Sequence, residues 1–124
     1  DRGVIMSEHI SDMPAAYLAS DIVLAPSVRP EAFGRVAAEA SAMAKPVIVS
    51  DHGGGRETVI EGETGARVEP GNAQSLAGAI RALLSVGPLA RDGMGRAGQQ
   101  HIRQHYSKRG LQAATLGVYK TLLE

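Results

Sequence analysis

Residues 45–57 read KPVIVSDHGGGRE, and this stretch decides the fold class. Its apolar run, residues 46–50, does not alternate with polar residues, which predicts a strand buried on both faces. The glycines that follow favour positive φ angles and close backbone approach, so they cannot continue the strand. We therefore expect a buried strand, a glycine-rich loop over residues 51–55, and a short helix that starts at Arg56.

Similar apolar runs flank this stretch on both sides. Residues 3–6, 21–25 and 66–68 are rich in Val, Ile and Ala and predict further strands buried on both faces. Helical patterns lie between them, one from the N-cap Asp12 to about residue 19 and one from Phe33 or Gly34 to about residue 44. This alternation predicts an α/β fold in which helices flank a parallel sheet.

The second half of the chain is predicted to be mainly helical. After a turn at residues 69–72, apolar residues recur at helical spacing until Gly87-Pro88 breaks the pattern. Further helices are expected from residue 88 to 106 and from 107 to 124. Neither a repeat nor a linker separates the halves, so residues 1–124 are interpreted as a single domain.

Composition excludes several classes of protein. The chain has 124 residues, no cysteine and a formal net charge of zero. Disulfides and thiolate metal sites are therefore excluded, which suits a reducing compartment such as the cytoplasm. A neutral chain with three Tyr and one Phe is also poorly suited to nucleic acid. No apolar stretch approaches the roughly 18 residues of a membrane span.

Two groups of charged side chains allow more than one interpretation. Five bases but only one acid lie between residues 88 and 110, so this run could contact a membrane surface or simply form a solvated helix face. His101 and His105 are four residues apart, as in some metal sites, but no carboxylate completes a zinc motif. We expect no metal there.

The loop over residues 26–35 is a candidate anion site. It leaves a predicted strand and enters a helix at Gly34, where free amides and the helix dipole suit a phosphate. Glu31 and Glu39 bracket this helix start, about 12 Å apart if all eight steps are helical, which is roughly the length of a sugar diphosphate. The alternative is that both glutamates are ordinary surface acids. Glu39 lies among apolar helix residues, however, and a buried or cleft position would require a partner.

The loop over residues 51–57 gives weaker evidence on its own. Three glycines at 53–55 would admit a ligand, but a tight turn is an equally good explanation. The loop lacks the G-x-G-x-x-G spacing of dinucleotide folds and the G-K-[ST] ending of P-loops.

Taken in order, these motifs resemble the large family of retaining GT-B glycosyltransferases. Glu31 and Glu39 match its E-x7-E motif, KPVIVS at residues 45–50 matches a following strand motif, and GGGRE at residues 53–57 resembles a G-G-x-x-E loop. Residues 63–68 and 70–77 resemble two later motifs of the same family. The departures, at Ala44, Glu63 and Asn72, lie outside the proposed site.

The resemblance implies a partial Rossmann-like sheet that forms the C-terminal part of a GT-B fold and binds a nucleoside-diphosphate sugar without a metal or other cofactor. It implies that Glu31 lies by the donor sugar as the candidate catalytic residue and that Glu39 binds the ribose. The remaining candidate donor-binding residues are Phe33, Gly34, Arg35, Gly53 and Gly54.

The resemblance also implies missing parts. Family members carry an acceptor domain and an earlier stretch of the donor domain with an Arg and a Lys for the diphosphate, and neither is found in these 124 residues. We therefore expect an incomplete donor-binding domain of a longer enzyme, inactive alone because the facing domain completes the site. Its uncovered strands would favour self-association. A stand-alone nucleotide-sugar-binding module and a sugar-nucleotide epimerase remain the alternatives.

Overall fold

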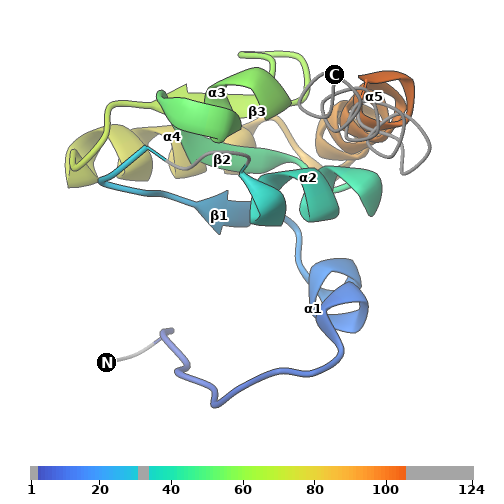
Figure 1. The fold of residues 1–124 in the computed structure, drawn as a ribbon, viewed down its shortest axis with the longest axis horizontal. Coiled ribbons are helices and arrows are strands. Elements are labelled where there is room, and N and C mark those ends of the chain that lie inside the picture. The colour runs from blue at the N-terminus through green and yellow to red at the C-terminus, as the bar shows by residue number, and fades with distance from the viewer. Residues whose placement is uncertain (1–2, 31–33, 106–124) are drawn as a thin grey trace, which may run out of the picture.

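The computed structural model describes residues 3–30 and 34–105, which form a parallel β-sheet with helices on both faces (Figure 1). The strands are β1 (Val23–Ala25), β2 (Val47–Ser50) and β3 (Gly65–Val68), in the order β1-β2-β3. Leu24 pairs with Ile48, and Ile48 pairs with Ala66. The predicted fold class, an α/β parallel sheet with flanking helices, is confirmed.

The central strand β2 divides the core into two apolar clusters, because successive side chains of a strand point to opposite faces. Val47 and Val49 pack with α1 (Met13–Ala19) and α2 (Arg35–Ala42) on one face. Ile48 packs on the other face with α4 (Ala73–Ser85). All four residues of β2 are buried, as its apolar run predicts.

Two further helices complete the described structure. The short helix α3 (Gly53–Thr58) follows β2, and α5 (Pro88–His105) packs against α2. Gly95 of α5 lies so close to the carbonyl of Ala44 that a Cβ atom could not fit between them. The close approach of α5 to the end of α2 therefore depends on this glycine.

Side chains cap the helices at several ends. Asp12 Oδ1 accepts a hydrogen bond from the Ala15 amide at the start of α1, as its N-cap position predicts. Asn72 caps α4 in the same way, through the Ser75 amide. At the other end of α4, Arg91 Nη1 donates to the carbonyls of Leu83 and Leu84. These bonds satisfy backbone groups that the helix termini leave free.

The predicted strand at residues 3–6 is wrong. These residues form neither a strand nor a helix, and the side chains of Val4, Ile5 and Met6 are 70%, 92% and 89% exposed. In Figure 1 this segment lies at the lower left, near the N-terminus and away from the sheet. A strand is stabilised by hydrogen bonds to a neighbouring strand. Within the described residues, no strand of the sheet pairs with this segment.

The expectation that every strand is buried on both faces is also wrong for β1. Leu24 is 42% exposed, because β1 lies at one edge of the described sheet and α4 packs over β2 and β3 instead. Helix α2 ends at Ala42, two residues before the predicted end, and Ala44 adopts a positive φ of 60°. The helix predicted over residues 107–124 lies outside the described residues.

The glycine-rich loop is shorter than predicted, because α3 begins at Gly53 rather than at Arg56. Gly53 has a φ of 59°, and a Cβ atom on Gly55 would lie 3.2 Å from Val49 Cβ. The glycines therefore let the first turn of a helix lie directly on β2. Their conformational freedom suggests a loop when the sequence is considered alone, but the packing against β2 favours a helix.

Candidate functional site

The candidate site lies at the carboxyl ends of the strands, where ligands bind in open α/β sheets. The amide of Ser27, after β1, donates a 2.8 Å hydrogen bond to Ser50 Oγ at the end of β2. Beside this bond is a hollow of about 280 Å³. Among its lining residues are Ser27, Val28, Ser50, Glu69, Asn72 and Leu76.

Gly34 is the point of contact between the two segments that the sequence predicts to bind the donor. It has φ 65° and ψ 52°, the left-handed conformation that glycine adopts without strain, and it precedes the first residue of α2. A Cβ atom on Gly34 would lie 2.9 Å from the Gly55 nitrogen and 3.1 Å from the Gly54 carbonyl carbon. The start of α2 and the start of α3 therefore meet with no room for a side chain between them.

The structure thus brings four of the predicted donor-binding residues into one region. Gly34 and Gly54 are buried at the contact between α2 and α3, whereas Arg35 and Gly53 are exposed beside it. The first-turn amides of α2 include that of Arg35, and such amides have no acceptor within their own helix. Glu31 and Phe33 lie outside the described residues, so the structure does not place them.

Glu39 has a partner on each of its carboxylate oxygens. The Tyr17 hydroxyl donates to Oε2 at 2.9 Å, and Arg35 Nε donates to Oε1 at 2.9 Å. The Glu39 side chain is 40% exposed, so it reaches the surface while remaining anchored. Tyr17, Arg35 and Glu39 are called the Glu39 cluster below. Glu39 is not among the residues that line the 280 Å³ hollow, so the cluster is separate from it.

Tyr17 is the member of this cluster that sequence reasoning did not assign to the site. Only 4% of its surface is exposed, and its ring belongs to the same apolar cluster as Val47. Burial raises the pKa of its hydroxyl, and the hydrogen bond and negative charge of Glu39 raise it further, whereas the positive charge of Arg35 lowers it. The phenol therefore remains a protonated donor at neutral pH.

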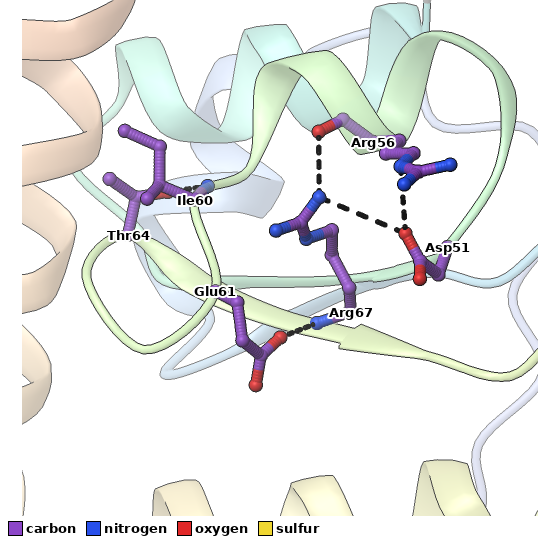
Figure 2. A network of polar contacts seen from close by, with 6 residues as sticks. All are labelled: Asp51, Arg56, Ile60, Glu61, Thr64 and Arg67. Atoms are coloured by element: carbon purple, nitrogen blue, oxygen red, sulfur yellow. Dashed lines mark hydrogen bonds and ion pairs between the residues drawn. The ribbon is translucent and has the colours of Figure 1, made fainter.

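A second group of charged side chains joins the loop before α3, α3 itself and β3 (Figure 2). Asp51 Oδ1 forms ion pairs with two arginines, at 3.4 Å from Arg56 Nε and 3.8 Å from Arg67 Nη1. Arg67 also donates from Nη1 to the carbonyl of Arg56, and from its backbone amide to Glu61 Oε2. Asp51, Arg56 and Arg67 are called the Asp51 cluster below.

The Asp51 cluster was not predicted from the sequence, although one signal was available. Asp51 follows β2 directly and Arg67 lies in β3. Parallel neighbours bring these positions together, since Arg67 pairs with Val49 in the sheet. Opposite charges at the ends of adjacent predicted strands therefore indicate an ion pair that fastens the loop after β2 to β3.

Within residues 3–30 and 34–105, no three His, Cys, Asp or Glu side chains are grouped as potential metal ligands. The rings of His101 and His105 lie 4.8 Å apart, centroid to centroid, and His101 Nε2 is 3.5 Å from the Glu57 carbonyl. His52 lines a small recess with Ser27 and Ser50 at the strand ends.

Comparison with known proteins identifies the family. The sequence profile described as "Glycosyl transferases group 1" matches residues 2–101, which is most of the chain. This chain belongs to the group 1 glycosyl transferases. A capsular polysaccharide biosynthesis glycosyltransferase of Staphylococcus aureus, CapM, is 31% identical over 98% of the chain, and a D-inositol 3-phosphate glycosyltransferase of Corynebacterium glutamicum is 41% identical over 75% of it.

Solved structures agree with this assignment. A glycosyltransferase from Rickettsia africae superimposes with a TM-score of 0.84 at 35% identity, over 93% of this chain and 31% of that protein. The Anabaena protein HepE in complex with UDP-glucose gives a TM-score of 0.78 at 31% identity, over 88% of this chain and 30% of HepE. The group 1 transferase chain therefore has the α/β structure of a part of these GT-B glycosyltransferases, as its motifs predict.

The chain corresponds to only a part of each relative. It spans 31% of the staphylococcal enzyme and 22% of the corynebacterial one. Within the described residues, no helix is both long and apolar enough to cross a membrane.

Proposed function

We propose that this chain is the donor-binding part of an enzyme that transfers a sugar from a nucleoside-diphosphate sugar to an acceptor with retention of configuration. The observation that carries the proposal is the anchored, half-exposed carboxylate of Glu39 on α2, the helix that Gly34 precedes. The similarity to HepE, which was solved with UDP-glucose, supports a nucleotide-sugar donor. The glycosyltransferase relatives favour transfer over epimerisation.

Each candidate residue has a role in this proposal. Glu39 accepts hydrogen bonds from ribose hydroxyls, and the amides at the start of α2, after Gly34, hold the sugar diphosphate. Gly53 and Gly54 keep the start of α3 free of side chains, so that the donor can approach the backbone. Phe33 contributes a further amide, and Glu31 acts beside the donor sugar as the catalytic residue. Amides and a helix dipole offset the phosphate charge, so no metal or other cofactor is required.

The partners of the chain follow from the same proposal. The rest of a longer enzyme supplies the acceptor domain and excludes water from the reaction, so the 124 residues alone are inactive. The longer enzyme works in the cytoplasm, in polysaccharide or glycolipid synthesis, with a peripheral contact to the membrane.

Donor titration and product analysis of the longer enzyme test the function. Calorimetric titration with UDP-, ADP- and GDP-sugars should identify one donor that binds tightly, and proton NMR of the product should show the anomeric configuration of the donor retained. No binding of any nucleotide sugar would contradict the proposed donor site. An inverted product would contradict retention alone.

Self-association of the isolated chain can be tested separately. The exposed Leu24 on the edge strand β1 leaves apolar surface in water, at about 25 cal/mol for each Å². We expect light scattering at tens of micromolar to give a mass above that of one chain. A strictly monomeric mass with unfolding independent of concentration would contradict self-association.

A further inference from the structure

The contact between Tyr17 and Glu39 joins two helices that are far apart in the sequence. The two residues are separated by 22 positions, and the 2.9 Å hydrogen bond is made by side chains only. The Tyr17 ring is buried among the residues that pack α1 and α2 onto the sheet. Packing therefore fixes the ring, and the ring fixes the position of its hydroxyl.

The hydrogen bonds of Glu39 leave acceptor capacity on both oxygens. An ionised carboxylate offers about four acceptor positions, two on each oxygen. Tyr17 occupies one position on Oε2, and Arg35 occupies one on Oε1. One position remains on each oxygen, an arrangement that suits two neighbouring hydroxyls such as those of a ribose.

The two donors to Glu39 differ in how firmly they can hold it. The Arg35 side chain is 85% exposed, so water competes for its guanidinium and the ion pair stabilises the geometry little. Tyr17 is 4% exposed and its ring is held by the core, so little rotamer freedom remains to be lost in keeping this hydrogen bond. The orientation of the carboxylate is therefore determined mainly by Tyr17.

We propose that Tyr17 is a positioning residue for donor binding, which fixes the Glu39 carboxylate so that its two remaining acceptor positions face the donor's sugar hydroxyls. This inference rests on the function proposed above, and Tyr17 itself touches no donor atom. Its contribution is pre-organisation, because a carboxylate that is already oriented loses less freedom when the donor binds. Tyr17 also packs in the core. The substitution Tyr17→Phe keeps the packed ring and removes only the hydroxyl.

A double-mutant cycle separates positioning from packing. We would measure the dissociation constant of the tightest-binding nucleotide sugar for the longer enzyme and its Tyr17→Phe, Glu39→Gln and doubly substituted variants. Tyr17→Phe should weaken binding by about threefold to tenfold, the worth of one hydrogen bond. On the Glu39→Gln background, the same change should weaken binding by less than about twofold, because the carboxylate it orients is gone.

Each outcome of the cycle has a distinct meaning. An equal loss from Tyr17→Phe in both backgrounds, or no loss in either, would overturn the positioning role. If Glu39→Gln leaves donor binding unchanged, the role proposed for Glu39 fails as well, and the two failures are thereby distinguished. Urea unfolding of each variant shows whether any loss of binding comes from a loss of folded protein.

The ultraviolet titration of Tyr17 tests the hydrogen bond without any donor. The chain has two other tyrosines, Tyr106 and Tyr119, which would be changed to Phe so that Tyr17 alone gives the tyrosinate signal. Glu39→Gln should then lower the pKa of Tyr17, because it removes the negative charge that helps to raise it. A pKa that does not change on this substitution would overturn the proposal.

Discussion

The Glu39 cluster and the Asp51 cluster both pair a carboxylate with arginine, yet they differ in what surrounds the carboxylate. Glu39 is held by a buried phenol as well as an exposed arginine, and both bonds are 2.9 Å long. Asp51 has contacts of 3.4 and 3.8 Å to two arginines, and its own side chain is 45% exposed. The difference therefore lies in the buried phenol and the shorter contacts of Glu39, since the two carboxylates are exposed to a similar degree.

The comparison shows how a structural ion pair differs from a candidate binding group. The Asp51 cluster connects backbone segments, since Arg67 also bonds to the Arg56 carbonyl and to Glu61 (Figure 2). Its polar groups are directed at one another. In the Glu39 cluster the carboxylate has one donor per oxygen, of which Tyr17 is buried, and still reaches the surface. Such an arrangement fixes a carboxylate and leaves it able to accept further hydrogen bonds.

The largest effect is expected where the start of α2 meets α3, beside the Glu39 cluster. Gly34→Ala should lower the free energy of unfolding by about 3 kcal/mol, because it adds left-handed strain and drives a Cβ atom into the Gly55 backbone. Gly62→Ala is the matched control, since Gly62 has a φ of 77° with open space around it. Urea denaturation should show a loss of only about 1 kcal/mol for the control. Equal losses of stability in the two variants would mean that the clash with Gly55 does not contribute to the effect of Gly34→Ala.

Removal of the Glu39 carboxylate should have the next largest effect. We expect Glu39→Ala in the longer enzyme to raise the donor dissociation constant about tenfold or more, because a hydrogen bond to a charged group is worth about 1.5 to 3 kcal/mol. Glu61→Ala removes a carboxylate beside the Asp51 cluster and should leave the constant unchanged in calorimetry. A similar loss of donor affinity in both variants would indicate a general effect of charge. It would contradict the proposal that only the Glu39 cluster binds the donor.

The buried phenol of Tyr17 should make the free energy of unfolding of the chain decrease at alkaline pH. The pKa of Tyr17 is raised above its ordinary value of 10.0, so above pH 10 the folded chain retains a proton that the unfolded chain loses. The stability that wild type gains over Tyr17→Phe should be fully present below pH 10 and decline as the pH rises through the folded pKa. Urea denaturation from pH 8 to 11 measures this. A constant difference between the two proteins would show that Tyr17 titrates as it does in the unfolded chain.

The smallest effect is expected in the Asp51 cluster itself. Asp51→Asn should lower the free energy of unfolding by less than about 1 kcal/mol, because its ion pairs are exposed and long. The loss should shrink further in 1 M salt, where the screening length falls to about 3 Å. Urea denaturation at two salt concentrations tests this. A large loss that salt does not reduce would show that Asp51 stabilises the fold through hydrogen bonds rather than charge.

Local patterns predicted the parts of the fold that depend on neighbouring residues. The apolar runs at β1, β2 and β3, the cap at Asp12 and the turn before α4 follow from periodicity and turn chemistry within a few residues. Predictions from the sequence were wrong where the conformation of a segment depends on the strand or helix packed beside it. Residues 3–6 have strand composition but no strand beside them in the described structure, and Gly53 begins a helix because β2 supports it.

The candidate site shows the same division. Motif spacing pointed to Glu39, Gly34 and the glycine loop, and the structure places Gly34 against Gly54 and Gly55. Tyr17 was missed because its apolar surroundings in the sequence predict only a core residue. The catalytic assignment of Glu31 remains a prediction, as does the role of Phe33.

The sequence by itself determined the α/β class, the order of the central elements and the family, because strand periodicity, helix caps and motif order are all properties of short stretches of chain. The tertiary structure alone decided which groups hold the Glu39 carboxylate and which face of each strand is covered. Those features depend on how helices dock on the sheet, and docking brings together residues such as Tyr17 and Glu39 that are 22 positions apart. No local pattern encodes such a distance, because it results from the packing of the whole core.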